Sequence, residues 1–351
     1  MRRNCWLRLG GMGEGWGPRG APQSRPFPKL GLRPRPRSSN AGGAIYVAAA
    51  ANLLARPAIE DEARSADKAG VRGRSPRFRE GAGLGSHRRT AFLLATTATR
   101  AALTALRTRS PGDPARWQRT NFAGRTVELH AGPAAAVGAA VGAAVLAPRA
   151  RAAASLAVLA AGACGAYDDV VGAEDPRRGF RAHLTALRAG EVTSGAVKLF
   201  GVSAAALAAG ALLKQRPVDK ALAGVVIAGT AHFVNLVDVR PGRAAAAVLA
   251  LGAPGLLRAG PGATLAAASM GAAAAVLPDD IAQRTMIGDT GAHALGAALG
   301  AAIVAGNHRV GLAAHAAGLV AAAACGDTVS RLARTGLAPK GEGDEEVRAA
   351  R

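Results

Sequence analysis

Residues 286–306, MIGDTGAHALGAALGAAIVAG, join a short polar signature to a long apolar run. The signature is Gly288 to Gly291, and after Asp289 the run contains no Lys, Arg or acidic residue. Three other polar signatures lie at the edges of apolar stretches: Arg119 to Asn121, Asp168 with Asp169, and Asn235 to Asp238. Carboxylates at a membrane edge are costly. Several of them on one face therefore predict a site that handles a metal ion and phosphate.

The composition indicates a membrane protein. The chain has 351 residues, of which 50% are hydrophobic and only 3% aromatic, and its formal net charge is +21. Long tracts of Ala, Gly, Val and Leu with almost no internal charge predict an all-α, polytopic integral membrane protein. The basic residues lack the interleaved aromatic residues of a single-strand binder, so no nucleic-acid partner is expected. Cys5, Cys164 and Cys325 have no CxxC spacing and predict neither a disulfide framework nor a zinc site.

The apolar pattern predicts about nine transmembrane helices around a cytoplasmic cleft. They are expected near 88–106, 131–147, 151–166, 194–213, 219–234, 244–257, 262–277, 290–306 and 309–325. The connectors on one side are long and hold all four signatures: 107–130, 167–193, 235–243, 278–289 and 326–351. These connectors also hold most of the connector Lys and Arg, so the positive-inside rule places them in the cytoplasm.

Three regions follow from this pattern: an extension over 1–87, a membrane domain over 88–330 and a charged cytoplasmic tail over 331–351. Residues 1–87 are rich in Arg, Pro and Gly and lack sustained periodicity. One interpretation is a disordered basic arm that meets anionic lipid. The other is a mis-called start in a GC-rich gene. The topology favours the second interpretation, because the first span would begin outside and leave the basic arm there.

The acidic positions suit a hard cation. Asp168 and Asp169 are neighbours at the end of a span, and neighbours on a helix point about 100° apart, so the two carboxylates can do different work. Asp289 lies between Gly288 and Thr290 at the start of a span, where a helix N-terminus favours anions. Mg²⁺ commonly takes one or two carboxylates plus substrate phosphates. The alternative is that Asp168 and Asp289 only cap their helices.

A third group of polar residues follows the span near 219–234. Asn235 and Asp238 precede Arg243, and an Asn at a helix end can hold a base or ribose while an Arg fork matches phosphate oxygens. Helix termination with positive-inside anchoring explains the same residues equally simply.

These motifs, in this order, resemble those of the polyprenyl-phosphate sugar-1-phosphate transferases. That family includes the phospho-MurNAc-pentapeptide translocase, which makes lipid I, and the undecaprenyl-phosphate GlcNAc-1-phosphate transferases. The resemblance covers about 88–330 and rests on Arg-Thr-Asn-x-x-Gly-Arg from Arg119, Gly-Ala-Tyr-Asp-Asp from Gly165, Asn-Leu-Val-Asp from Asn235 and Met-Ile-Gly-Asp-Thr-Gly from Met286.

The resemblance implies Mg²⁺-dependent transfer of a sugar-1-phosphate from a UDP-sugar to a polyprenyl phosphate, with release of UMP. Such a reaction initiates a cell-wall or envelope glycan at the cytoplasmic face of the bacterial inner membrane, and a homodimer is possible. By position, Asp289 would be the metal ligand and Asp168 and Asp169 the catalytic pair that positions or deprotonates the lipid phosphate. The substrate-binding residues would be Asn121, Asn235, Asp238, Arg243, Gly288 and Thr290.

The chain also departs from the family's pattern. Ala292 stands where members usually have Ser, the second Asp expected after Asp238 is missing, and there is neither a His-rich loop nor a tenth span. These departures favour a rival interpretation, a non-catalytic relative that binds the lipid carrier or scaffolds cell-wall assembly. A transporter would instead show charges near mid-bilayer and paired broken helices, a pattern that the sequence lacks.

Overall fold

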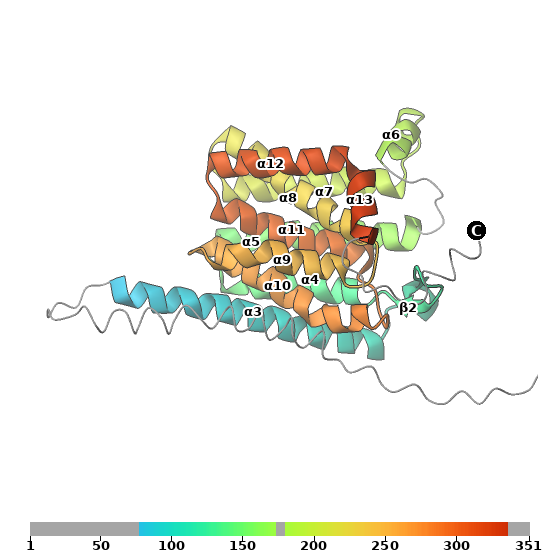
Figure 1. The fold of residues 1–351 in the computed structure, drawn as a ribbon, viewed down its shortest axis with the longest axis horizontal. Coiled ribbons are helices and arrows are strands. Elements are labelled where there is room, and N and C mark those ends of the chain that lie inside the picture. Colours follow the sequence, from blue (N-terminus) through green and yellow to red (C-terminus); the bar gives the residue numbers. More distant parts are fainter. Residues whose placement is uncertain (1–76, 173–179, 336–351) are drawn as a thin grey trace, which may run out of the picture. The chain divides into compact units, whose positions relative to one another are not determined.

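Helices form nearly all of the regular structure in this computed structural model, which describes residues 77–172 and 180–335 (Figure 1). In chain order the elements are α3 Arg77–Thr108, η1 Pro114–Trp117, β1 Gln118–Thr120, β2 Thr126–Glu128, α4 Ala131–Gly142, η2 Ala143–Val145, α5 Pro148–Val171, α6 Phe180–Arg188, α7 Ser194–Leu213, α8 Pro217–Val237, α9 Arg243–Leu256, α10 Pro261–Ile281, α11 Gly288–Gly306, α12 Arg309–Ala324 and α13 Gly326–Thr335. The strands β1 and β2 pair antiparallel and form one small hairpin.

Several helices are long and apolar enough to cross a membrane. By length and composition, α5, α7, α8 and α10 meet this requirement. The pair α12 and α13, bent by 83° at their junction, counts as a fifth span when taken together. The chain is therefore an all-helical, multi-pass membrane protein in the part that the structure describes. A helix lies at each predicted span, but α4 and α9 are shorter apolar helices, and the structure supports four or five spans by these criteria.

The first helix differs from its predicted bounds, because α3 begins at Arg77 and not near residue 88. A helix is held by its own backbone hydrogen bonds, so it can continue beyond its apolar part into Gly- and Arg-containing sequence. Residues 1–76 of the predicted extension and 336–351 of the predicted tail lie outside the described residues. So do residues 173–179 of the connector after α5.

The helices α10 and α11 form the centre of the bundle. Nearly every side chain of both is buried, and α11 packs against α4, α5, α8, α9 and α10. Small residues allow these close contacts. A Cβ on Gly296 would lie 2.6 Å from the Cα of Ala231, and one on Gly300 would lie 2.7 Å from the Cα of Ile227. The GxxxG spacing of α11 thus brings its backbone against α8.

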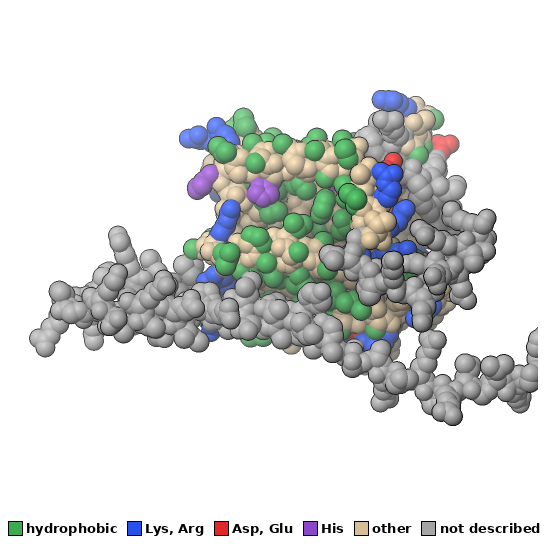
Figure 2. Space-filling model, viewed as in Figure 1, with side chains coloured by type: hydrophobic (Ala, Val, Ile, Leu, Met, Phe, Trp, Pro, Cys, Tyr) green, Lys and Arg blue, Asp and Glu red, His purple; other side chains and the backbone are tan. Residues whose placement is uncertain are grey.

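The outer helices expose apolar side chains along their lengths. Leu93 of α3, Phe200 of α7 and Val320 of α12 are 62%, 54% and 59% exposed. In Figure 2, hydrophobic and neutral side chains cover the middle of the helices, whereas Lys and Arg gather at their ends. Contiguous exposed apolar surface bounded by charge is the pattern expected of a lipid-facing belt.

The short connectors meet at one end of the bundle. Arg149 Nε donates to the Leu212 carbonyl at 2.7 Å, and Lys214 Nζ donates to the Asn307 carbonyl at 2.7 Å. Arg258 Nη1 donates to Asn307 Oδ1 at 2.8 Å. We call this the short-connector end. The other end contains the C-terminus of α5 and the N-terminus of α11, and we call it the carboxylate end.

Candidate active site

The C-terminal part of α5 lies directly against the first turn of α11. A Cβ on Gly165 would fall 2.7 Å from the Cα of Thr290, so no larger residue fits there without moving a helix. The next residues of α5 on this side are Asp168 and Asp169, about one helical turn further along. The close approach at Gly165 therefore brings the second signature beside the fourth.

Asp169 holds the N-terminus of α11. Its Oδ1 accepts a hydrogen bond from the Asp289 backbone N–H at 3.0 Å, and its Oδ2 accepts from the backbone N–H and the hydroxyl of Thr290 at 2.9 and 2.6 Å. The N-cap residue of α11 itself, Ile287, supplies no side-chain cap. Asp169 thus satisfies donors that a helix start leaves without partners, although it comes from a different helix.

Gly288 makes room for this arrangement. Its φ is +58°, in the left-handed region, and a Cβ there would lie 2.9 and 3.0 Å from the two carboxylate oxygens of Asp169. Gly288 and Thr290, predicted to bind substrate, therefore both contribute to the contact between α5 and α11.

Asp168 and Asp289 both contact the ammonium group of Lys198. Lys198 Nζ, in the second turn of α7, donates to Asp168 Oδ2 at 2.6 Å and also to Asp289 Oδ2. The three side chains are between 19% and 26% exposed, so the cluster remains reachable from solvent. Sequence reasoning missed Lys198. The signal was present, because a single Lys in an apolar span is rare unless it is paired.

The hairpin connects the first signature to the second and to the loop before α11. Arg119 donates through Nη2 to the Asp169 carbonyl. Asn121 Oδ1 accepts from the backbone N–H groups of Ala123 and Arg125 at 2.9 and 3.0 Å, which closes the hairpin turn. Asn121 Nδ2 donates to Gln283 Oε1 at 2.9 Å. The side chain of Asn121 is thus engaged within the hairpin and its neighbouring loop.

Two further contacts position the hairpin. The Thr285 hydroxyl and the Met286 N–H both donate to the Glu128 carbonyl, at 2.7 and 2.9 Å. The guanidinium of Arg240 lies over the ring of Phe122, 4.3 Å from its centroid. This cation–π contact joins the hairpin turn to the loop that follows α8.

The third signature reaches the same region through Asp238. Burial and the neighbouring carboxylates, Asp280 first and then Asp289 and Asp169, raise the pKa of Asp238 well above its usual range. Asn235 is half-buried at the end of α8, and its side chain makes no hydrogen bond with any residue that the structure describes. Arg243 is the first residue of α9. The predicted site residue Asp238 thus lies close enough to Asp280, Asp289 and Asp169 to interact with them electrostatically.

All four signatures therefore meet at the carboxylate end. Among the described residues, no three His, Cys, Asp or Glu side chains converge as a metal site. Two do converge, because Asp168 and Asp289 contact the same ammonium group. Two carboxylates and open access fit Mg²⁺, which takes its remaining ligands from water and substrate phosphates.

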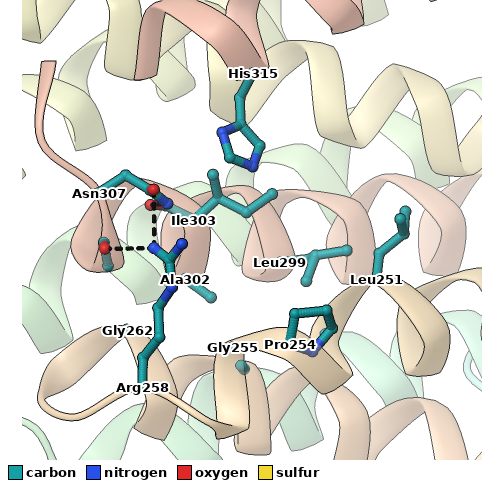
Figure 3. A pocket seen from close by; sticks show the side chains of 13 residues that line it. Leu251, Pro254, Gly255, Arg258, Gly262, Leu299, Ala302, Ile303, Asn307 and His315 are labelled. Atoms are coloured by element: carbon teal, nitrogen blue, oxygen red, sulfur yellow. Dashed lines mark hydrogen bonds between the residues drawn. The ribbon is translucent and has the colours of Figure 1, made fainter. Parts of the chain in front are cut away.

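A separate cavity lies at the short-connector end (Figure 3). Its volume is about 80 Å³, and it is lined by residues of α9 to α12, among them Leu251, Leu299 and His315. Arg258 faces it, but its Nη1 already donates to the Gly306 carbonyl and to Asn307 Oδ1, both at 2.8 Å. This arrangement ties two connectors together and lies at the opposite end from the carboxylates.

Comparison with protein-family models and with curated proteins finds no match to this chain.

Proposed function

We propose that the protein is a phosphoglycosyl transferase that moves a sugar-1-phosphate from a UDP-sugar to a polyprenyl phosphate. The observation that carries this proposal is that Asp168 and Asp289 both contact the ammonium group of Lys198. This contact lies at the end of the bundle where the four signatures meet. The likeness of those signatures to the polyprenyl-phosphate transferases supplies the reaction class.

In this proposal an oxygen of the lipid phosphate attacks the phosphorus that carries the sugar. The bond from that phosphorus to the bridging oxygen breaks, and UMP leaves with the electron pair. Both reactants are anions that repel each other, so the main task of the site is to neutralise and align them. Asp168 and Asp289 would hold Mg²⁺, which when bound would offset the charge of the diphosphate.

The other residues have distinct roles in the proposal. Lys198 keeps the two carboxylates together and supplies a cation for a phosphate oxygen. Asp169 is a positioning residue, because both of its side-chain oxygens bind α11. Asn235, Asp238 and Arg243 are proposed to contact the nucleotide, on the side where Asp238 adjoins the carboxylates. Asn121 would act by holding the hairpin against the Gln283 loop.

The proposal includes the finer topology. We propose nine spans, with α3, α4, α9 and α11 crossing the membrane beside the helices that meet the length requirement, and with the carboxylate end in the cytoplasm. The lipid substrate would enter from the bilayer and the UDP-sugar from the cytoplasm. This orientation puts each reactant on the side of the site from which it can reach the carboxylates.

The test is an activity assay on membranes that contain the protein. Undecaprenyl phosphate, Mg²⁺ and a panel of UDP-sugars are supplied, and UMP release is followed. We expect release with at least one donor, a loss of about 10²-fold or more in Asp289→Asn, and no change in Asp327→Asn, a carboxylate on exposed α13 at the same end. Equal release from wild type and Asp289→Asn would refute the proposal.

One observation favours a second candidate, a non-catalytic protein that binds the lipid carrier. The ammonium of Lys198 contacts both Asp168 and Asp289 and offsets part of their negative charge. This candidate predicts retention of polyprenyl phosphate with no UMP release from any donor, and binding that does not depend on Mg²⁺.

A further inference from the structure

A groove separate from the carboxylate cluster opens between α3 and α10. Its volume is about 320 Å³, and its lining includes Thr96 and Arg100 of α3, Ala274 and Asp279 of α10, and Arg284 just beyond α10. Asp280, the neighbour of Asp279, accepts a hydrogen bond from the Gly242 N–H at 2.8 Å. Because neighbours on a helix point about 100° apart, the side chain of Asp279 lines the groove, whereas that of Asp280 lies near Asp238.

The polar end of the groove is built around a buried carboxylate. Asp279 is only 3% exposed, and it accepts from Arg100 Nη1 at 2.6 Å and from Arg284 Nε at 2.8 Å. Arg107 Nη1 lies 3.5 Å away and also pairs with Glu128. Three guanidinium groups thus meet two carboxylates, which leaves an excess positive charge at this place.

The two arginines that line the groove keep donors available. The side chains of Arg100 and Arg284 are 49% and 50% exposed. Within the part of the chain that the structure describes, Nε and Nη2 of Arg100 and Nη1 of Arg284 make no hydrogen bond. Asp279 fixes both side chains, so these donors are held in place for a second anion, and a guanidinium fork matches phosphate oxygens.

The rest of the groove is largely apolar, because Ala274, Ala275 and Pro278 of α10 line it beside Thr96. The Thr96 hydroxyl donates to the Gly271 carbonyl at 3.1 Å, which joins α3 to α10 about one turn deeper than Arg100. Leu93 lies seven residues before Arg100, on the same face of α3 and about 10 Å deeper along the helix, and it is 62% exposed. A cationic site for a headgroup therefore lies next to the exposed apolar side chain of Leu93, which we call the apolar lane. This combination suits an amphiphile with an anionic headgroup.

We propose that this groove binds an anionic glycerophospholipid, with the phosphodiester between Arg100 and Arg284 and an acyl chain along Leu93. Basic pockets between membrane helices suit such headgroups. The apolar lane favours a lipid over free phosphate, which would gain nothing from Leu93. The inference does not rest on the transferase proposal, since none of these residues belongs to the carboxylate cluster.

The test is native mass spectrometry of the full chain in an uncharged detergent, titrated with phosphatidylglycerol or with phosphatidylcholine. We expect about five- to tenfold tighter binding of phosphatidylglycerol. This preference should disappear in Arg284→Gln, in which Asp279 stays paired with Arg100 and Arg107, and also in Arg100→Gln. Arg151→Gln, an exposed arginine near the short-connector end, serves as the matched control and should bind as wild type.

Two results would overturn the inference. One is an unchanged lipid preference in both Arg284→Gln and Arg100→Gln. The other comes from a competition arm: if inorganic phosphate displaces phosphatidylglycerol at equal concentration, the groove is a site for free phosphate and the apolar lane contributes nothing. Thermal unfolding of each variant in the same detergent checks that lost binding does not reflect lost folding.

Discussion

Lys198 is the basic residue that joins the two carboxylates of the candidate site. Its ammonium contacts both Asp168 and Asp289 in a region about four-fifths removed from solvent. A cation so placed can be a permanent part of the site or can hold the place that a divalent ion takes. The two roles separate when the charge is removed and the length of the side chain is kept.

We therefore predict that Lys198→Met lowers the free energy of unfolding by about 1–3 kcal/mol in EDTA, because two partly buried carboxylates lose a hydrogen-bonded counter-charge. Mg²⁺ should restore more stability to this variant than it adds to wild type, by filling the same place. Thermal unfolding in detergent, with and without Mg²⁺, measures both effects.

The control for this comparison is Lys220→Met on α8, which has no partner among the described residues and should respond to Mg²⁺ as wild type does. An equal Mg²⁺ effect in Lys198→Met and wild type would show that the two carboxylates do not share a cation site.

Asp238 gives a prediction about pH. Because burial and Asp280 raise its pKa in the folded protein, the folded state favours the protonated carboxyl more than the unfolded state does. The free energy of unfolding should then fall as pH rises above the ordinary Asp pKa of about 4, until the raised pKa is passed. Removing the carboxylate of Asp238 should therefore stabilise the protein only at pH values above the ordinary Asp pKa of about 4.

Asp238→Asn is thus expected to raise the melting temperature near neutral pH and to leave it unchanged well below pH ~4, where wild type is protonated in both states. The measurement is thermal unfolding across this pH range without Mg²⁺. Asp113→Asn, at an exposed 3₁₀-helix cap, is a control for the loss of one carboxylate. A constant difference between Asp238→Asn and wild type at all pH values would contradict the assignment.

At the scale of elements, the junction of α5 with α11 depends on Asp169. Both of its oxygens accept from the first turn of α11, and an Asn in its place would turn an NH₂ group toward one of those donors. We predict that Asp169→Asn lowers the free energy of unfolding by about 1–3 kcal/mol and increases hydrogen exchange in the first turn of α11.

Asp168→Asn is the matched variant for this prediction, because the side chain of Asp168 contacts Lys198 and not the α11 backbone. It should lower activity while the amide protection of α11 stays near that of wild type. If the two variants loosen α11 equally, Asp169 is not the residue that anchors it.

The hairpin shows which elements the sequence could and could not predict. The apolar runs predicted a helix at every expected span, because Ala-, Val- and Leu-rich stretches have few alternatives in a membrane. The connector 107–130 gave no such pattern, so β1, β2 and their contacts with Gln283 and Thr285 were not predicted. The hairpin depends on partners far away in the sequence, and local composition does not contain them.

The candidate site was predictable only in part for the same reason. The positions of Asp168, Asp169 and Asp289 at the edges of apolar runs predicted that they gather on one face. Their separate roles follow from packing, since Gly165 brings α5 against α11 and leaves Asp169 to cap it while Asp168 faces Lys198. No spacing within one segment distinguishes these two carboxylates.

At the scale of the whole molecule, the unequal charge of its two ends predicts its orientation in the membrane. Hydrogen bonds join the short connectors to one another, and the long connectors contain the signatures and most of the connector arginines, among them Arg116, Arg119 and Arg125. The positive-inside rule predicts that this arginine-rich end lies in the cytoplasm. Single cysteines, in a background without Cys5, Cys164 and Cys325, can report the side on which each end lies.

We predict that a membrane-impermeant maleimide labels Ala259→Cys and His308→Cys on intact spheroplasts, and labels Ala123→Cys and Ala189→Cys only after lysis. All four positions are exposed, the first two in short connectors and the last two in long ones. The reverse pattern would show that the protein has the opposite orientation, with the carboxylates outside, where a UDP-sugar does not reach them. Labelling of both groups on intact spheroplasts would contradict the separation of the two ends by a membrane.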